Sequence, residues 1–407
     1  MRRDSRMNNP AAADLPIEVH TRPGQVLGMP PARFLRDYWQ RRPLLVRGAF
    51  AGMQAPLTPE ELAGLACEDA ALARLVRHEP HGDRWQVRNG PFDEADFAAL
   101  PRTHWTLLVQ DVDKWDGDVA ALLAHFDFLP SWRIDDIMVS YAVDGGSVGA
   151  HVDQYDVFLI QGLGRRRWSI DSNPDAPSAF RDDVELKLLR RFEASHDWLL
   201  DAGDLLYLPP GVPHHGVAEG ACLTFSVGTR APSLAELVAD FAASVAETLP
   251  ESRRYGDAGM APALRAGEIT ADVLETLRSE LSAALTADSA FLRGWFGSFI
   301  TRYRMAAEAI PRTPPLGAAA FARRLAAGDG LMRNPWSRMA WNALPRGAEL
   351  HVAGDTHRCS RALAERLCQP HALAAAEILA LDETARTLLL DLVNASHLAL
   401  VRARRKR

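Results

Sequence analysis

The chain has 407 residues, of which 47% are hydrophobic and 24% are charged, and its formal net charge is −6. These values are typical of a globular protein of two or three domains, and they exclude a chain that binds nucleic acid through an overall positive charge. The four cysteines form neither a CxxC pair nor the spacing of a zinc site, which predicts a reducing compartment.

The N-terminal part of the chain begins with a polar segment, residues 1–15, which we expect to be a frayed tail. It lacks the apolar stretch of a signal peptide, and no apolar run approaches the roughly 20 residues of a membrane span. We therefore expect a cytoplasmic protein that does not enter a membrane. A helix is predicted after Pro30 and Pro31, and another is predicted to begin at Thr58, with Glu61 in the position of a capping box.

Short apolar or alternating segments occupy the region from about residue 105 to 230, separated by Gly, Pro, Asp and Asn. This pattern predicts an antiparallel barrel or double sheet. Alanine- and leucine-rich segments with helical spacing follow, and the last hundred residues mix short strands with helices in the manner of a small winged-helix module. We predict an α+β fold whose domains are a catalytic barrel domain with its N-terminal segment, a helical domain and a C-terminal module: 1–232, 233–308 and 309–407.

His151 and Asp153 stand two residues apart in GSVGAHVDQYDVFLIQG, and in a strand such positions face the same side. A second histidine follows in LLYLPPGVPHHGV, at His214 or His215. Two imidazoles and one carboxylate form the ligand set of non-haem Fe(II) oxygenases, whose open positions accept an anionic co-substrate and oxygen. Only one of two adjacent histidines can point inward; the spacing from the Pro–Gly turn favours His214. His215 would then be a solvated neighbour or a wall of the substrate channel.

Arg166 lies in GLGRRRWSI and shares a strand face with Trp168 and Ile170, so we expect all three side chains inside the barrel. A buried guanidinium needs an anionic partner, which is either a structural salt bridge or the distal carboxylate of a dicarboxylate co-substrate. The Ser226 hydroxyl could help to bind that co-substrate. Tyr155 has the same strand parity as His151 and Asp153, so it could line the co-substrate pocket. For both residues the alternative is a place in the core. The basic C-terminal sequence VRARRKR is a solvated tail or, by charge alone, an RNA or ribosome contact.

Four segments of the chain resemble the JmjC-type ribosomal oxygenases, and more narrowly the bacterial ribosomal protein arginine hydroxylases: FLRDYWQRRPLLVRGAF, GGSVGAHVDQYDVFLIQGLGRRRW, GDLLYLPPGVPHHGV and FSVGTRAPS. The resemblance covers about residues 28–235, and the order of the following domains is similar. It implies a JmjC double-stranded β-helix of the cupin type, a helical domain that forms a homodimer, and a C-terminal winged-helix domain that does not bind DNA in the usual way.

The same resemblance implies that His151, Asp153 and His214 hold Fe(II) and that Arg166 holds 2-oxoglutarate, with O2 as the other co-substrate. The family reaction converts 2-oxoglutarate to succinate and CO2 and hydroxylates the β-carbon of an arginine. In the bacterial branch that arginine belongs to the large-subunit ribosomal protein numbered sixteen. The family often has an acidic residue where this chain has His215, a difference that can alter substrate contacts.

Two other functions are compatible with these residues. The first is a related oxygenase of the same fold, either a ribosomal protein histidyl hydroxylase or a lysine demethylase, since the metal and co-substrate residues do not distinguish these reactions. The second is a non-catalytic cupin that binds a ribosome or another partner.

Overall fold

The computed structural model describes residues 15–402, apart from residues 23, 263, 287 and 303–308. The tails expected at the two ends therefore lie almost entirely outside the described residues. The chain divides into two compact units, Met1–Ala231 and Pro232–Arg407. The expected further division at residue 309 stays a prediction. No described helix is long and apolar enough to cross a membrane.

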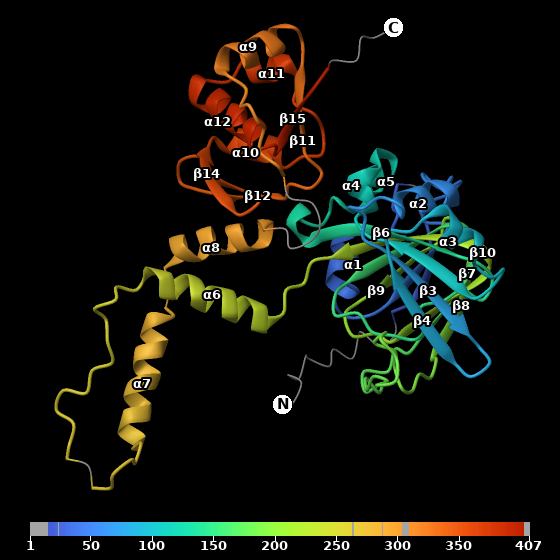
Figure 1. Ribbon diagram of the computed structural model, residues 1–407, viewed down its shortest axis with the longest axis horizontal. Coiled ribbons are helices and arrows are strands. Elements are labelled where there is room, and N and C mark those ends of the chain that lie inside the picture. The colour runs from blue at the N-terminus through green and yellow to red at the C-terminus, as the bar shows by residue number, and fades with distance from the viewer. Residues whose placement is uncertain (1–14, 23, 263, 287, 303–308, 403–407) are drawn as a thin grey trace. The chain divides into compact units, whose positions relative to one another are not determined.

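The first unit is built on one curved sheet in the order β1-β2-β9-β7-β10-β6-β5-β3-β4, with β8 paired to β7 (Figure 1). The two longest strands, β7 and β10, are antiparallel neighbours, and their pairing shifts register between Glu219 and Leu223. This shift lets one strand serve two differently oriented parts of the barrel. The strands are β1 (Glu18–His20), β2 (Leu44–Arg47), β3 (Ala73–Glu79), β4 (Arg84–Asn89), β5 (Trp105–Val109), β6 (Ile134–Ala142), β7 (Val157–Ile170), β8 (His196–Leu200), β9 (Leu205–Leu208) and β10 (His214–Thr229).

The helices of the first unit are short, and the two that the sequence predicts begin where expected. α1 starts at Pro31, directly after Pro30. α2 starts after Thr58, whose hydroxyl accepts the Glu61 backbone N–H while the Glu61 carboxylate accepts the Thr58 backbone N–H, so the predicted capping box is confirmed. The helices are α1 (Pro31–Asp37), α2 (Pro59–Leu65), α3 (Glu94–Ala98), α4 (Val112–Trp115) and α5 (Gly117–Ala121).

A cluster of aromatic rings attaches α1 to the barrel. Phe34 is fully buried, and its ring centroid lies 4.9 Å from that of Tyr207 on β9 and 5.8 Å from that of Phe158 on β7. The Tyr207 hydroxyl donates to the buried Asp156 carboxylate at 2.6 Å, and the Gln40 side chain donates to the same carboxylate at 3.0 Å. Apolar contact and buried hydrogen bonds thus hold the N-terminal segment on the strands that lead into the site.

The second unit begins with three helices and continues as a small α+β fold. Its sheets are the antiparallel β12-β13-β14 and the β11–β15 pair. Gly297 on α8 lies directly against the ring of buried His351 on β13, where a larger residue would collide with it. The elements are α6 (Leu234–Thr248), α7 (Ala271–Ala284), α8 (Ser289–Thr301), α9 (Ala318–Ala326), β11 (Gly330–Arg333), β12 (Met339–Ala343), β13 (Ala348–Val352), β14 (Asp355–Cys359), α10 (Arg361–Leu367), α11 (Ala375–Leu379), α12 (Glu383–Asn394) and β15 (Leu398–Val401).

Replacing Phe34 with alanine should destabilise the first unit, because it removes the ring around which the aromatic cluster packs. We expect a loss of about 3–5 kcal/mol in the free energy of unfolding, measured by urea denaturation. Arg33→Ala, a change at an exposed position of the same helix, should stay within about 0.5 kcal/mol of the wild type. A Phe34→Ala loss as small as that of the control would contradict the packing described.

Candidate metal centre

His151, Asp153 and His214 lie together in the first unit, with one ligand atom of each within 4.8 Å of the others. The Asp153 Oδ2 atom lies 3.9 Å from Nε2 of His151 and 3.6 Å from Nε2 of His214. Neighbouring ligands with bonds of about 2.0–2.2 Å to one ion lie roughly 3.0–3.5 Å apart, so small side-chain shifts would bring these atoms onto a shared ion.

Both imidazoles present the same nitrogen to Asp153. The Nδ1–H of His151 donates to the Gly149 carbonyl at 2.9 Å, and the Nδ1–H of His214 donates to the Val212 carbonyl at 2.9 Å. These bonds place the proton on Nδ1 and leave the Nε2 lone pair for a metal. Burial lowers the pKa of His214 well below its ordinary value, so its imidazole is neutral at pH 7 and suited to metal binding.

A two-residue backbone bridge brings the ligands together. The His151 N–H donates to the His214 carbonyl at 3.0 Å, and the His214 N–H donates to the His151 carbonyl at 3.0 Å. Residues 152–156 are not in a strand, so the expectation that Asp153 and Tyr155 follow strand alternation is wrong. His151 itself forms only an isolated bridge to His214 in the segment between β6 and β7. Asp153 is held by its backbone carbonyl, which accepts the Gly211 N–H at 2.8 Å.

Arg166 on β7 is buried, as predicted, together with Trp168 and Ile170. Its guanidinium lies 5.0 Å from the Trp168 ring centroid, and that ring lies 5.9 Å from the His214 ring. The guanidinium donates only long bonds of 3.3 Å, to the Ser140 hydroxyl and the Gly216 carbonyl, and its Nε has no partner among the described residues. No carboxylate of the described chain pairs with it, so a structural salt bridge does not explain its burial.

Gly216 makes room for this arginine. A Cβ atom at this position would lie 2.7 Å from the Arg166 Nε and 2.7 Å from the Trp168 ring. Burial lowers the pKa of the Arg166 guanidinium, which nevertheless stays charged because its ordinary pKa is so high. The site therefore contains a fixed positive charge that lacks an anion.

The two remaining predicted residues lie in different surroundings. Ser226 is buried on β10, opposite Met138 on β6 and Leu159 on β7. Tyr155 is 40% exposed, which excludes the core position considered for it, and its phenol is hydrogen-bonded to the Asp153 carboxylate.

Asp136 on β6 is a residue near the site that was not predicted from the sequence. Its carboxylate accepts the Asp111 N–H at 3.0 Å, burial raises its pKa to about 7, and its charge acts on the Tyr155 phenol. Asp136 has the same strand parity as Met138 and Ser140, and that parity was the signal that could have revealed it.

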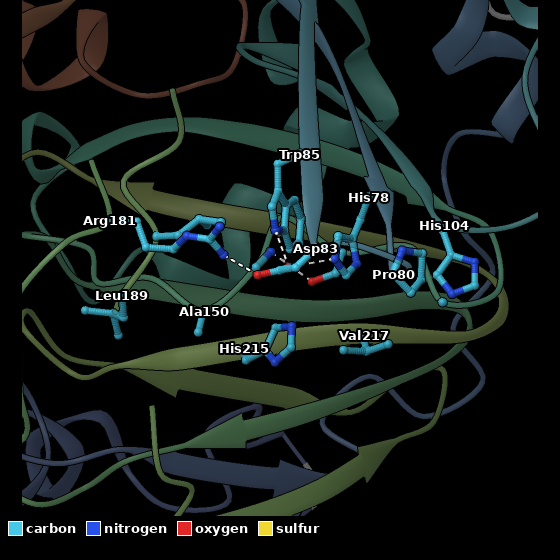
Figure 2. A pocket seen from close by; sticks show the side chains of 14 residues that line it. His78, Pro80, Asp83, Trp85, His104, Ala150, Arg181, Leu189, His215 and Val217 are labelled. Carbon is cyan, nitrogen blue, oxygen red and sulfur yellow. Dashed lines mark hydrogen bonds and ion pairs between the residues drawn. The ribbon is translucent and has the colours of Figure 1, made fainter. Parts of the chain in front are cut away.

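His215 faces away from the metal ligands and lines a cavity of about 370 Å³ (Figure 2). The cavity lies between the β3–β4 hairpin, the start of β10 and the segment that joins β7 to β8. A wall of a channel, one of the two possibilities considered for His215, agrees with this position. The lining residues share an aromatic or apolar character with a few polar groups: His78, Pro80, Asp83, Trp85, His104, Gly145, Ser147, Gly149, Ala150, Arg181, Leu188, Leu189, His215 and Val217.

Comparison with known proteins decides the family. Residues 121–237 match the JmjC domain and residues 284–399 match the ROXA-like winged helix. The chain is 39% identical over 300 residues to the ribosomal protein uL16 3-hydroxylase of Escherichia coli. The matched region covers 74% of this chain and 79% of that protein. The chain belongs to the ribosomal oxygenases. This ribosomal oxygenase is also 42% identical over 209 residues to a probable ribosomal oxygenase of Haemophilus influenzae, across 51% of each chain.

Solved structures are similar over nearly the whole ribosomal oxygenase chain. One of E. coli YcfD has a TM-score of 0.82 at 34% identity and covers 92% of this chain and 99% of that one. A second, of the E. coli ribosomal oxygenase YcfD in complex with cobalt and 2-oxoglutarate, has a TM-score of 0.79 at 35% identity with the same coverage. The expected fold, a JmjC cupin barrel followed by a C-terminal winged helix, is confirmed.

Replacing Asp136 with asparagine should change how stability depends on pH. Burial raises the pKa of Asp136 from 3.8 to about 7, so the folded state favours the protonated carboxyl. The stability contributed by that protonation is present below about pH 4 and is lost as the pH rises to about 7. As the pH rises between these limits, the free energy of unfolding of the wild type, measured by urea denaturation, should fall by about 1–3 kcal/mol relative to that of Asp136→Asn. Asp135→Asn serves as the exposed control, and a pH-independent difference between wild type and Asp136→Asn would contradict the raised pKa.

Proposed function

We propose that this ribosomal oxygenase is an Fe(II)- and 2-oxoglutarate-dependent protein hydroxylase that oxidises the β-carbon of an arginine in the large-subunit ribosomal protein uL16. The observation that carries the proposal is the juxtaposition of the His151–Asp153–His214 cluster with a buried Arg166 that has no anionic partner. The substrate is the one named for the E. coli relative, and 2-oxoglutarate is the co-substrate found with its solved structure.

His151, Asp153 and His214 would hold the iron through two Nε2 atoms and one carboxylate oxygen. The residues fit the metal, because hydrogen bonds from both Nδ1 atoms orient the rings and burial keeps His214 neutral. Two neutral ligands and one carboxylate leave a divalent ion with residual positive charge, which favours an anionic co-substrate. When bound, the iron supplies the site at which 2-oxoglutarate and O2 react to oxidise the substrate.

Arg166 would bind the distal carboxylate of 2-oxoglutarate. Its planar guanidinium is suited to a bidentate pair with a carboxylate, and its buried surroundings strengthen that pair. The Ser140 hydroxyl already contacts the guanidinium, and Ser226 supplies a second buried hydroxyl on β10, opposite Met138 of the Ser140 strand. With one end of the co-substrate fixed by Arg166, its other end is oriented towards the metal ligands.

Asp136 and Tyr155 would contact the substrate arginine. An arginine side chain approaching the metal ligands needs a negative charge to offset its desolvation. The Asp136 carboxylate acts on the phenol of Tyr155, which in turn is hydrogen-bonded to Asp153. The electrostatic effect of a bound guanidinium would favour the ionised form of Asp136.

The second unit would form a homodimer through α7. Leu274, Leu277 and Leu281 follow one another at helical spacing on this helix and are 56%, 42% and 54% exposed. A row of exposed leucines is costly in water unless another surface covers it, and a second copy of the same helix offers a matching apolar row.

Alanine at His151 or Asp153 should abolish the reaction. Loss of a group that merely supports a metal ligand lowers activity by up to roughly 100-fold. Because each of these changes removes a ligand itself, we expect turnover to fall by more than that. The measurement is iron-dependent succinate formation in the presence of uL16, with Co(II) affinity from calorimetry as a second readout. His125→Ala, an exposed histidine in the same unit, is the control. Wild-type turnover in both ligand variants would refute the metal assignment.

Arg166→Ala should weaken the binding of 2-oxoglutarate without weakening the binding of the metal. Truncating one partner of a buried charged pair costs about 2–4 kcal/mol, so the KM for 2-oxoglutarate should rise by roughly 30- to 1000-fold. The matched control is Arg167→Ala, one residue away, because the Arg167 guanidinium points outward and pairs with Asp197 and Glu219. Equal KM values for 2-oxoglutarate in the two variants would show that Arg166 does not bind the co-substrate.

Replacing both Leu274 and Leu281 with glutamate should produce a monomer, because the substitutions place negative charge in the apolar row. Light scattering coupled to size exclusion should give about twice the 44.7 kDa chain mass for the wild type and the chain mass for the variant. Glu275→Gln on the same helix is the control. A wild-type mass of one chain would overturn the dimer.

A further inference from the structure

The cavity lined by His215 lies outside the set of residues assigned to iron and 2-oxoglutarate. Its wall includes the β3–β4 hairpin with His78 and Trp85, the β10 residues His215 and Val217, the β6–β7 segment with Ala150, and the segment between β7 and β8 that includes Leu189. Figure 2 shows these side chains converging on the cavity from different strands and loops. Its volume of about 370 Å³ is sufficient for one large side chain.

The charged groups in its wall are already paired. The Asp83 carboxylate accepts from the His78 Nε2 and the Trp85 Nε1, at 3.0 Å in both cases, and it also pairs with Arg181. Arg181 pairs in turn with Asp183. The His78 and Trp85 rings are stacked with centroids 4.0 Å apart, so this corner of the cavity is held rigidly.

Aromatic and apolar surface makes up most of the remaining wall. Leu188, Leu189, Val217 and the Trp85 ring contribute it. A charged occupant would lose its hydration without gaining a free partner of opposite charge, whereas an apolar occupant would bury surface against these side chains. Position 215 contributes an imidazole and no carboxylate to this wall.

The cavity and the metal ligands share the same two backbone segments. Ala150, in the cavity wall, precedes His151, and His215 follows His214. These segments are joined by the reciprocal hydrogen bonds between His151 and His214. An extended chain advances about 3.3 Å per residue, so a side chain two to four positions from the residue at the metal can reach the neighbouring cavity.

We propose that this cavity is a specificity subsite that receives an uncharged apolar or aromatic side chain of the ribosomal protein, within a few residues of the hydroxylated position. The inference rests on the proposed hydroxylase function and adds to it a requirement on the substrate sequence. Binding in this subsite positions the substrate backbone across the metal ligands. It takes no part in the binding of 2-oxoglutarate.

Val217→Trp tests the proposal by filling the cavity. With uL16 as substrate, KM should rise by about 10- to 200-fold, the range for a mismatched apolar pocket, while kcat and the KM for 2-oxoglutarate stay within about twofold of wild type. Ala221→Trp adds the same ring at an exposed position of the same strand and should leave all three values unchanged. An unchanged uL16 KM in a folded Val217→Trp protein would overturn the subsite.

Alanine substitution along a uL16 peptide identifies the occupant. Alanine at one apolar or aromatic position of the peptide should raise the peptide KM of the wild-type enzyme. The same peptide substitution should have little further effect on the Val217→Trp enzyme, which is the signature of a direct contact in a double-mutant cycle. If Val217→Trp fails to fold, Leu189→Ala is used instead; it enlarges the cavity, and the same peptide position should then lose its effect. Sensitivity only at charged positions would overturn the inference. Absence of turnover with wild-type enzyme would instead refute the proposed function, so the two failures are distinguishable.

Discussion

The site depends on two reciprocal backbone hydrogen bonds between His151 and His214, each 3.0 Å long. They join two segments that are distant in sequence, and they do so at the residues whose side chains converge on Asp153. Because the bonds are between backbone groups, the spacing of the imidazoles does not rely on flexible side chains. The Nδ1 bonds to Gly149 and Val212 then fix the rings. Such support keeps ligands in place before a metal arrives and lowers the reorganisation that binding requires.

The second constraint is an unpaired charge. Arg166 is buried against Trp168, with a free Nε and two long hydrogen bonds. A buried charge without a counter-ion lowers the stability of the fold, and residues that destabilise a fold in this way often belong to a binding site. A dicarboxylate would remove the penalty as it binds. Charge complementarity therefore accounts for both the location of Arg166 and the choice of co-substrate.

Strand alternation predicted part of the site from the sequence and failed elsewhere. It worked on β7, where a regular strand buries Arg166, Trp168 and Ile170 on one face. It failed for Asp153 and Tyr155 because residues 152–156 are not in a strand, and their conformation is set by contacts such as the hydrogen bond from the Gly211 N–H to the Asp153 carbonyl.

Other features required the tertiary structure or the family. Local patterns indicated an antiparallel barrel or double sheet and a C-terminal module of winged-helix type, and the resemblance identified the barrel as a JmjC domain. The cavity beside His215 could not be predicted, because its walls come from the β3–β4 hairpin, β10 and the segment after β7. Asp136 could have been found by parity, but its raised pKa depends on burial that the sequence does not reveal.

The most direct measurement is the intact mass and fragmentation of uL16 from cells of the source organism with and without this gene. With the gene present, uL16 should be one oxygen atom heavier, and the extra atom should map to the β-carbon of a single arginine. Re-expression of the Asp153→Ala variant should leave the protein unmodified. Identical uL16 masses in the two strains would contradict the proposed reaction, and an added oxygen on histidine or a lost methyl group on lysine would assign another reaction to the same metal centre.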